Sequence, residues 1–361
     1  MLYQVFDRSN KVAVAKMEAF IKSHANGHFL QLPQWAAVKT SWDWRGIFVY
    51  RQGQPIAAAS VLIRPLPLGF CMFYIPRGPV CDRNDRTVWA ELMTALKQTA
   101  KKHRAIILYT DPDEPDTNDD FHAIMQSLGF SEKSDEGFGN IQAQYVFRLN
   151  LASRNKEEVF SAFCSKTRYN IGLSRRKGVT VREYSGTEKI PNAELEAFYS
   201  LMVTTGQRDH FYIRNSAYFK NLMHTMQDDA HLLIAYLNDQ PIAGTIEAFC
   251  GRKAWYLYGA SANSHRNAMP NYLLQWTMIQ RAIERGCVFY DFRGVPGNPT
   301  ADNPLHGLYR FKKGFSGTYT KFTGLFTYSF RPVLGKLLQL ALQLRQRCTP
   351  CTRKSKTELL N

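Results

Sequence analysis

The chain has 361 residues, of which 45% are hydrophobic, and this length leaves room for two domains with separate cores. No apolar run approaches the ~20 residues that a membrane-spanning helix needs, which excludes the class of helical integral membrane proteins. The net charge is +16, from 46 Lys and Arg against 30 Asp and Glu. Such an excess favours a polyanionic partner: nucleic acid, an anionic membrane or a phosphorylated substrate.

The amino terminus and the cysteines indicate the compartment. Residues Met1 to Lys22 carry several charges and no long apolar core, so no secretory signal is expected. The seven cysteines are odd in number and lie mostly in apolar segments, as expected for reduced thiols in the cytosol. Cys348-Thr-Pro-Cys351 lacks a second pair or a histidine cluster, so no metal site is expected.

Two β-rich runs around a Gln-Gly turn predict a first hairpin over residues 46–64. A strand over Phe70–Ile75 and a helix over Thr87–His103 follow, the helix with apolar residues at helical spacing. A short strand then ends at Asp111, which either orients a site or caps a turn, and we favour the structural role. Residues 149–223 come next and contain basic helical stretches.

The same plan occurs a second time. A hairpin over residues 231–249 precedes a strand over Ala254–Ala260, a helix over Asn271–Arg285 and a strand that contains Asp291. Both hairpins contain the tetrapeptide Gln-Pro-Ile-Ala. Four matching elements in the same order indicate a duplication.

Hairpin, strand, helix and strand in this order resemble the GNAT acyltransferase fold, in which the central strands part to admit the acyl donor. We therefore expect an α/β (α+β) protein with two tandem GNAT-like domains and a cleft between them. The first domain takes residues 1–150 and the returning tail 325–361, and the second takes residues 151–324. Within the tail, residues 336–347 predict a basic amphipathic helix, which either contacts a membrane or packs on the first domain.

Enzymes of the GNAT type that use coenzyme A hold its pyrophosphate on backbone amides of a glycine-rich loop. The corresponding loops here are Arg77–Asp82 and Arg266–Asn271. Pro79 and Pro270 each remove an amide donor, and neither loop has the second glycine. An aminoacyl or other activated donor is thus favoured over coenzyme A, and no cofactor is expected.

Six segments resemble the FemABX family, whose members use aminoacyl-tRNA to add amino acids to the peptide of a peptidoglycan precursor. They span roughly residues 29–330 in family order, and YIPRGP and LYRFKKGF are the most specific. The segments are Phe29–Lys39, Tyr74–Val80, Thr110–Pro112, Arg208–Phe211 with Arg214 and Tyr218, Tyr256–Ser261, and Tyr290–Gly294 with Gly307–Phe315. The chain has no charged heptad run, so it resembles the compact form without a coiled-coil arm.

The resemblance implies a muramyl-pentapeptide acceptor, either UDP-linked or lipid-linked, and assigns residues to it. Lys39 and Arg214 would hold the phosphates, and Lys39 follows Trp35 by four residues on a short helix. Arg208 remains an alternative to Arg214, because the spacing of Arg208 to Tyr212 equals that of Arg214 to Tyr218. The residues that would line the acceptor site are Tyr218, Tyr256 and Tyr258. The last two alternate on a strand and are expected to share one face.

The resemblance also places Lys312, in the Phe311-Lys312 pair, beside the reacting ester. An amine attacking an ester produces a tetrahedral oxyanion, and a nearby cation stabilises it by ~3 kcal/mol. The alternative is a pair of solvated lysines, Lys312 and Lys313, on a surface strand. No residue stands out as a general base.

The positive charge has two candidate partners. A basic cluster with the tail would meet either the tRNA acceptor stem or anionic lipid head groups. The cluster comprises Lys166, Arg168, Arg175, Arg176 and Lys177. The expected protein is a monomeric cytoplasmic aminoacyltransferase. A location at the inner face of the plasma membrane is left open. The alternatives are a GNAT-type acyltransferase with a CoA or carrier donor, and a basic RNA-binding or membrane-binding module.

Overall fold

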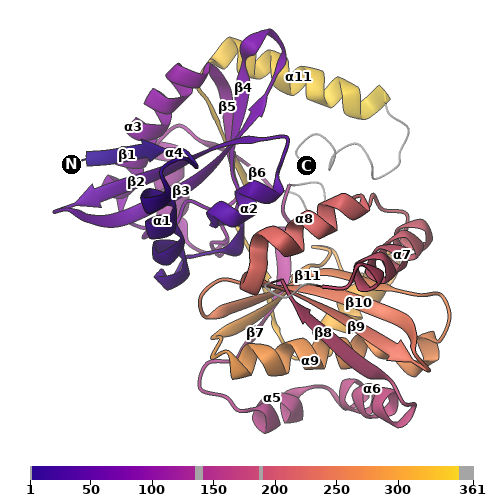
Figure 1. Cartoon of the computed structure of the whole chain (residues 1–361). Coiled ribbons are helices and arrows are strands. Elements are labelled where there is room, and N and C mark those ends of the chain that lie inside the picture. The colour runs from indigo at the N-terminus through magenta and orange to yellow at the C-terminus, as the bar shows by residue number, and fades with distance from the viewer. Residues whose placement is uncertain (1, 135–140, 187–189, 349–361) are drawn as a thin grey trace. The chain divides into compact units, whose positions relative to one another are not determined.

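The computed structural model describes residues 2–134, 141–186 and 190–348, which form two compact units (Figure 1). Unit 1 takes the described residues up to Gln144 and from Lys321 onward, and unit 2 takes Tyr145–Thr320. Each unit contains one seven-stranded sheet with helices packed against it. The expectation of an α/β protein with two similar sheets is confirmed.

The sheet of unit 1 is antiparallel except for the parallel pair β4–β5. The first hairpin is formed as predicted, and β14 at the returning end of the chain pairs with both β5 and β6. In spatial order the strands are β1 (Leu2–Phe6), β2 (Asp43–Arg51), β3 (Gln54–Pro65), β4 (Cys71–Ile75), β5 (Ala105–Thr110), β14 (Leu325–Ser329) and β6 (Ser131–Lys133).

Helix α3 supplies much of the core of unit 1. Its apolar face, which includes Trp89 and Leu92, packs with strand residues such as Phe73 and Leu108. The carboxylate of Asp85 accepts from the amides of Thr87 and Val88, which fixes where α3 begins. The helices of unit 1 are α1 (Lys11–Ser23), α2 (Pro33–Val38), α3 (Arg86–His103), α4 (Asp119–Ser127) and α11 (Pro332–Cys348), with short 3-10 turns η1 (Phe29–Gln31) and η2 (Pro67–Gly69).

The sheet of unit 2 repeats this plan, with β11 and β12 as its parallel pair. The second hairpin, the following strand and helix, and the last strand are all formed where the sequence predicts them. In spatial order the strands are β13 (Thr318–Lys321), β7 (Tyr145–Asn150), β12 (Phe289–Gly294), β11 (Lys253–Ser261), β10 (Gln240–Phe249), β9 (Ala230–Leu237) and β8 (Thr180–Ser185).

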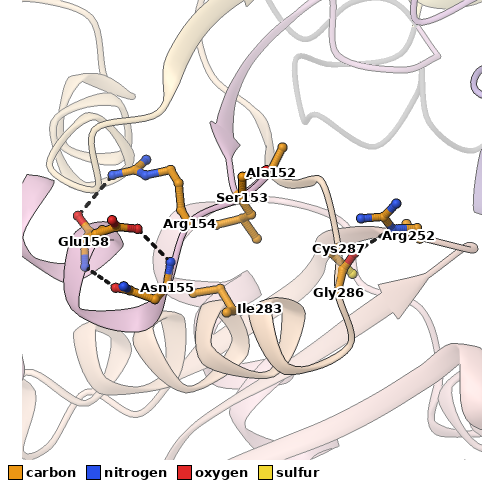
Figure 2. A pocket seen from close by; sticks show the side chains of 10 residues that line it. Ala152, Ser153, Arg154, Asn155, Glu158, Arg252, Ile283, Gly286 and Cys287 are labelled. Atoms are coloured by element: carbon orange, nitrogen blue, oxygen red, sulfur yellow. Dashed lines mark hydrogen bonds between the residues drawn. The ribbon is translucent and has the colours of Figure 1, made fainter.

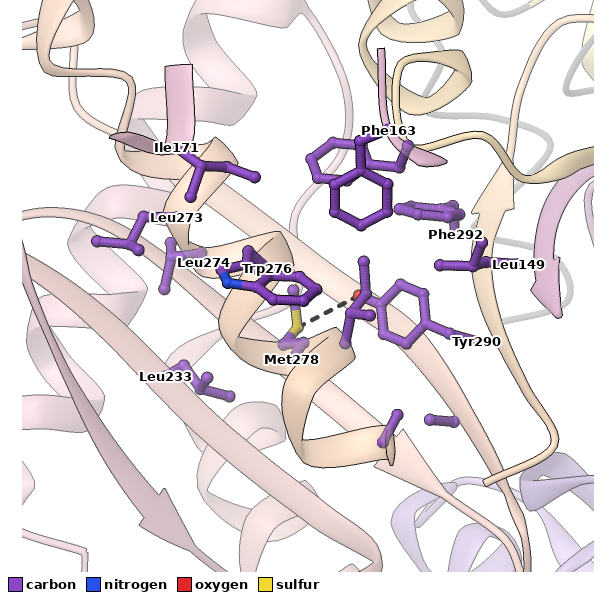
Figure 3. Packing of buried hydrophobic residues seen from close by; sticks show 14 of the residues in the cluster. Leu149, Phe163, Ile171, Leu233, Leu273, Leu274, Trp276, Met278, Tyr290 and Phe292 are labelled. Atoms are coloured by element: carbon purple, nitrogen blue, oxygen red, sulfur yellow. Dashed lines mark hydrogen bonds between the residues drawn. The ribbon is translucent and has the colours of Figure 1, made fainter. Parts of the chain in front are cut away.

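Helices cover both faces of the second sheet (Figure 1). Helices α7 and α8 pack on β9, β10 and β11 from one side, and α9, against which α6 lies, packs from the other. On the α9 side, Trp276 and Leu274 lie among Phe163, Tyr290 and Leu149 (Figure 3). The helices are α5 (Lys156–Ala162), α6 (Ser165–Arg176), α7 (Asn192–Asp209), α8 (Ser216–Met226), α9 (Pro270–Glu284) and α10 (His306–Lys313), with 3-10 turns η3 (Gln227–Asp229) and η4 (Arg266–Ala268).

The two copies differ at their parallel strands. In unit 1, β4 and β5 stay paired to their ends, where Ile75 faces Thr110. In unit 2, β11 and β12 pair only as far as Trp255 and Asp291 and then part. The parted strands of a GNAT-like domain therefore occur in unit 2.

The longest helices in the described part of the chain, α3 and α7, have 18 residues each, so these residues contain no coiled-coil arm. Among the same residues, no helix combines the length and apolarity needed to span a bilayer. The amphipathic helix expected over residues 336–347 is formed within α11, whose side chains are described as far as Ala341.

Candidate active site

The strand β11 is interrupted at Leu257. Its neighbour β10 pairs Glu247 with Tyr256 and Ile246 with Tyr258, so Leu257 is an extra residue, a β-bulge. Adjacent residues of β10 point to opposite faces, and so do the two tyrosines paired with them. The prediction that Tyr256 and Tyr258 share a face is wrong, because the bulge changes the alternation between them.

Tyr258 lies on the face covered by α8. Its hydroxyl is 3.1 Å from the hydroxyl of Tyr218, near the start of α8, and its ring packs edge-on against Phe219. The guanidinium of Arg214 lies 5.2 Å from the centre of the Tyr218 ring. Burial raises the pKa of both phenols, so they remain neutral hydrogen-bond donors. Arg214, Tyr218 and Tyr258 thus form one connected group, half-buried and polar.

Arg208 belongs to a different contact. Its guanidinium donates to the carbonyl oxygen of Ser261 at 3.1 Å and to the side chain of Asn263 at 3.2 Å, and it pairs with Asp209. These bonds hold the end of β11 against α7. The partners of Arg208 therefore give it a structural role. Arg214 lies instead over the ring of Tyr218, one of the residues assigned to the acceptor.

Lys312 lies on α10 and is 4% exposed, whereas Lys313 is exposed. The alternative of two solvated lysines on a surface strand is therefore wrong. The amine of Lys312 donates to the carbonyl oxygen of Gly294 at 2.8 Å, at the end of β12 beyond its parting from β11. Burial lowers the pKa of Lys312 to about 7, although the carboxylate of Asp291 acts in the opposite direction.

Tyr256 lies beside this lysine, on the face covered by α9. The amine of Lys312 is 5.6 Å from the centre of the Tyr256 ring. Tyr256 is hydrogen-bonded to Gln275, which also accepts from the hydroxyl of Tyr290 at 2.9 Å. Burial raises the pKa of Tyr256 to about 12, so it stays protonated near Lys312.

Two glycines make this packing possible. A Cβ on Gly259 would lie 1.6 Å from the Tyr256 hydroxyl, so only glycine lets the phenol fold back over β11. A Cβ on Gly314 would lie 2.4 Å from the hydroxyl oxygen of Thr167, so glycine lets the end of α10 approach α6. Phe311 fixes α10 from the other side by packing against Tyr272 and Phe315.

In unit 1, Lys39 and Trp35 face the same way, as their spacing predicts. Lys39 follows the last residue of α2, and its ammonium lies 5.3 Å from the centre of the Trp35 ring. The side chain is half-buried, and the buried tryptophan limits the positions that it can take. A lysine held in this way presents a localised charge that suits a phosphate.

Asp111 stabilises the loop that follows β4. Its carboxylate accepts from the hydroxyl of Tyr74 and from the amide of Arg77, both at 2.9 Å, and it is buried. Thr110 adds a bond to the carbonyl oxygen of Gly78 at 2.7 Å. These contacts are those of a structural residue, which is the role that the sequence favours for Asp111.

Neither helix start is arranged to hold a pyrophosphate. In unit 1, the carboxylate of Asp85 already occupies the first amides of α3. In unit 2, Pro270 opens α9 without an amide, and Met269 before it has a φ of 55°, where a cradle would place glycine. Both observations agree with the expectation from the loop sequences that coenzyme A is not the donor.

Other polar groupings have local explanations. A surface pocket in unit 2 is lined by Arg154, Asn155 and Glu158 (Figure 2). Asn155 and Glu158 form the capping box of α5, and Arg154 donates to the carbonyl oxygen of Glu158. In unit 1, Asp116, His122 and Glu132 lie close enough together to hold a metal ion, but Lys321 contacts Asp116 at 2.6 Å and supplies a positive charge there.

The five described cysteines are free thiols, and four of them are buried. Burial raises the pKa of Cys81 and Cys287 to about 12, which makes them unreactive. The Cys348–Cys351 pair lies outside the residues whose side chains are described.

Two residues near Lys312 and Tyr256 have no functional assignment from the sequence alone. Asp291 is buried and accepts from Arg148 at 2.8 Å and from the amide of Arg293. Gln275 links Tyr256 to Tyr290 from within α9. Asp291 could have been noticed because it lies in the last strand of the second copy, where the corresponding run of the first copy ends at Asp111. Gln275 could have been noticed only as a polar residue on the apolar face of a helix.

Comparison with known proteins shows which family the chain resembles. A model of the FemAB family matches residues 12–240 and 238–343. The lipid II:glycine glycyltransferase of Staphylococcus aureus is 28% identical over 92% of this chain and 94% of its own, and that of Staphylococcus haemolyticus gives the same values. The crystal structure of FemX has a TM-score of 0.84 and 26% identity, covering 94% of this chain and 100% of FemX. A tandem GNAT protein of clavulanic acid biosynthesis shares the fold at 11% identity and a TM-score of 0.55, over 91% of this chain and 98% of its own.

Proposed function

Because the chain belongs to the FemAB family, we propose that it transfers an amino acid from aminoacyl-tRNA to the stem-peptide amino group of a peptidoglycan precursor. The product would be part of an interpeptide bridge. The observation that carries this proposal is the buried amine of Lys312, held on Gly294 where β11 and β12 part. The precursor is a muramyl pentapeptide that carries phosphates, linked to UDP or to lipid.

In the proposed reaction, the acceptor amine attacks the ester carbonyl of the aminoacyl-tRNA. An amide C–N bond forms, the ester C–O bond breaks, and the proton lost by the amine ends on the ribose hydroxyl. Lys312 in its protonated form stabilises the oxyanion that forms between these steps. A lysine with a pKa of about 7 is still partly protonated at neutral pH. A group whose pKa lies near the working pH gives up and takes back a proton most readily.

Two cations and two phenols are assigned to the acceptor. Lys39 in unit 1 and Arg214 in unit 2 are assigned to the phosphates, because each is a cation restrained by an aromatic ring. Tyr218 and Tyr258 are assigned to the peptide, as neutral phenols that donate hydrogen bonds. Tyr256 lies on the other face of β11 and is assigned to the reacting ester with Lys312.

The donor surface that we propose is α6 with its flanking residues. The sequence has no acidic residue between Glu158 and Glu183, and Lys166, Arg175 and Arg176 are exposed. Tyr169 is exposed among them, with the guanidinium of Arg176 5.5 Å from its ring centre. Basic side chains and an open aromatic ring suit the unpaired end of an RNA.

The start of α6 lies next to the end of α10, the helix that carries Lys312. This supports the assignment of the α6 surface to the donor. The amide of Cys164, which precedes α6, donates to the carbonyl oxygen of Gly314 at 3.0 Å, and Gly314 follows α10 directly. An RNA end bound along α6 would therefore start next to the helix that carries Lys312. We place the enzyme in the cytoplasm, at the inner face of the membrane when the acceptor is lipid-linked.

The test is direct transfer. Purified protein is incubated with UDP-linked or lipid-linked muramyl pentapeptide and, separately, with each charged tRNA, and the product is weighed by mass spectrometry. A mass gain of one aminoacyl residue is expected. Product from acyl-CoA with no gain from any charged tRNA would support the GNAT-type alternative instead. Binding of RNA or vesicles without any transfer would support the basic binding module.

A further inference from the structure

Large apolar side chains gather on the outside of unit 1 at α11 and the turn η2. In the described part of the chain, nine large hydrophobic residues are exposed, and four of them lie here. They are Leu68 (84% exposed), Val333 (74%), Leu337 (57%) and Leu340 (52%). Isolated exposed apolar residues are ordinary, but a group of four on two adjoining segments is not.

The three residues on α11 form a stripe. Val333, Leu337 and Leu340 are four and three residues apart, so they lie on one side of the helix. Helix α11 contacts β5, and Leu334 and Leu338 are partly buried. The helix therefore has an apolar side for packing and a second apolar side that faces away from unit 1.

The turn η2 joins the same surface. The ring of Phe70 lies 4.6 Å from the guanidinium of Arg104 and 5.7 Å from that of Arg331. Leu68 is two residues before Phe70, and Val333 is two residues after Arg331. Leu68 and the start of α11 thus belong to one region of unit 1, and α11 is labelled in Figure 1.

The segment that contains α11 is basic. From Asn303 to Thr357 the sequence contains no acidic residue, and Arg331 and Lys336 are exposed. A helix with an outward apolar stripe and flanking cations has the composition of a segment that lies in the interface of an anionic bilayer. An RNA partner would not need the leucines, and a second copy of the chain would bring equally basic residues into contact.

We propose that α11 and Leu68 form a docking face for an anionic lipid bilayer. Leu68, Val333, Leu337 and Leu340 enter the boundary between head groups and acyl chains, and Arg331 and Lys336 contact lipid phosphates. The docking proposal rests on the proposed function only in the purpose of docking, which is to bring the enzyme to a lipid-linked acceptor. The binding itself requires neither donor nor acceptor.

The experiment measures sedimentation of the full chain with vesicles of phosphatidylcholine, with and without one quarter phosphatidylglycerol. Binding is expected only to the anionic vesicles and is expected to weaken with salt. The double variant Leu337→Gln/Leu340→Gln should lower the partition coefficient by on the order of 10-fold or more. Leu68→Asn should lower it as well, and asparagine tolerates the φ of 60° at this position.

Val12→Gln is the matched control, since Val12 is 80% exposed on α1, and it should bind vesicles as the unmodified chain does. Undiminished vesicle binding by the double variant would overturn the proposal. So would a concentration-dependent dimer that the double variant abolishes, because the stripe would then join two copies. Transfer from each charged tRNA to a UDP-linked and to a lipid-linked precursor is measured in parallel. Its absence with both precursors, together with normal vesicle binding, would refute the proposed function alone.

Discussion

The amine of Lys312 donates a 2.8 Å hydrogen bond to the carbonyl oxygen of Gly294, beyond the point where β12 parts from β11. A backbone carbonyl fixes the position of the amine without neutralising it, in contrast to a carboxylate partner. Because Lys312 is buried, its charge would act on a developing oxyanion with little screening by water.

Lys312→Met should reduce the rate of transfer by about 100-fold to 1,000-fold, because the cation that stabilises the oxyanion is lost. Methionine has a similar length and fits a buried site, so the fold and the KM for the acceptor should be preserved. Single-turnover and steady-state kinetics with the precursor measure both values. Lys313→Met changes the exposed neighbour and should leave the rate unaltered; full activity in Lys312→Met would remove Lys312 from the mechanism.

The depressed pKa of Lys312 predicts a pH dependence of stability. The unfolded chain binds the lysine proton up to a pKa near 10.5, whereas the folded chain releases it at about 7. Between these values the unfolded state carries more protons, so the free energy of unfolding should rise with pH, by up to about 1.4 kcal/mol per pH unit. Urea unfolding of the unmodified chain and of Lys312→Met, compared from pH 7 to 10, isolates this contribution. A difference between the two that is independent of pH would show that Lys312 titrates normally.

The β-bulge at Leu257 predicts that the two tyrosines of β11 act on different kinetic parameters. Tyr256→Phe should lower kcat, because the ring that lies beside Lys312 loses its hydrogen bond to Gln275. Tyr258→Phe and Tyr218→Phe should raise the KM for the acceptor, and the double variant should be less than additive, because the two hydroxyls bond to each other. Equal effects of Tyr256→Phe and Tyr258→Phe on kcat would contradict this separation.

Gly259→Ala should impair transfer although residue 259 has no reactive group. The added Cβ would overlap the Tyr256 hydroxyl and push the ring away from Lys312. Circular dichroism should show a folded protein with a lower kcat. Combining Gly259→Ala with Tyr256→Phe should cost less than the sum of the two single changes. Phenylalanine lacks the oxygen that overlaps most, although the ring carbon Cζ would still lie 2.4 Å from the added Cβ. Strict additivity would mean that Gly259 acts on something other than Tyr256.

The duplication was predictable because it is carried by local patterns: hairpin turns, alternating strands and amphipathic helices such as α3 and α9. The bulge at Leu257 was not, since nothing in Tyr-Leu-Tyr-Gly distinguishes a bulged strand from a regular one. A parting of central strands follows from the resemblance to the GNAT fold. Its restriction to β11 and β12 of the second copy could not be predicted, because it depends on long-range pairing. For Lys312, the sequence left a buried site and a surface strand both open. The buried amine lies by the Gly294 carbonyl and the Tyr256 ring, and no local pattern reveals contacts between such distant segments.

Asp111, which directly follows β5, and Asp291, which lies within β12, give a final contrast. Asp111 bonds to Tyr74 and to the Arg77 amide in unit 1, where the strands stay paired. Asp291 lies near Lys312 in unit 2, and its charge acts to raise the pKa of that lysine.

Asp111→Asn should therefore lower the free energy of unfolding by about 1–3 kcal/mol and leave kcat unchanged at temperatures where the protein is folded. Asp291→Asn should lower the pKa of Lys312 further, reduce the protonated fraction at neutral pH and so decrease kcat. Thermal unfolding and transfer rates of both variants, measured at several pH values, separate the two roles. A loss of kcat in folded Asp111→Asn would mean that the first copy also takes part in the chemistry, because an intact fold leaves no structural explanation for the loss.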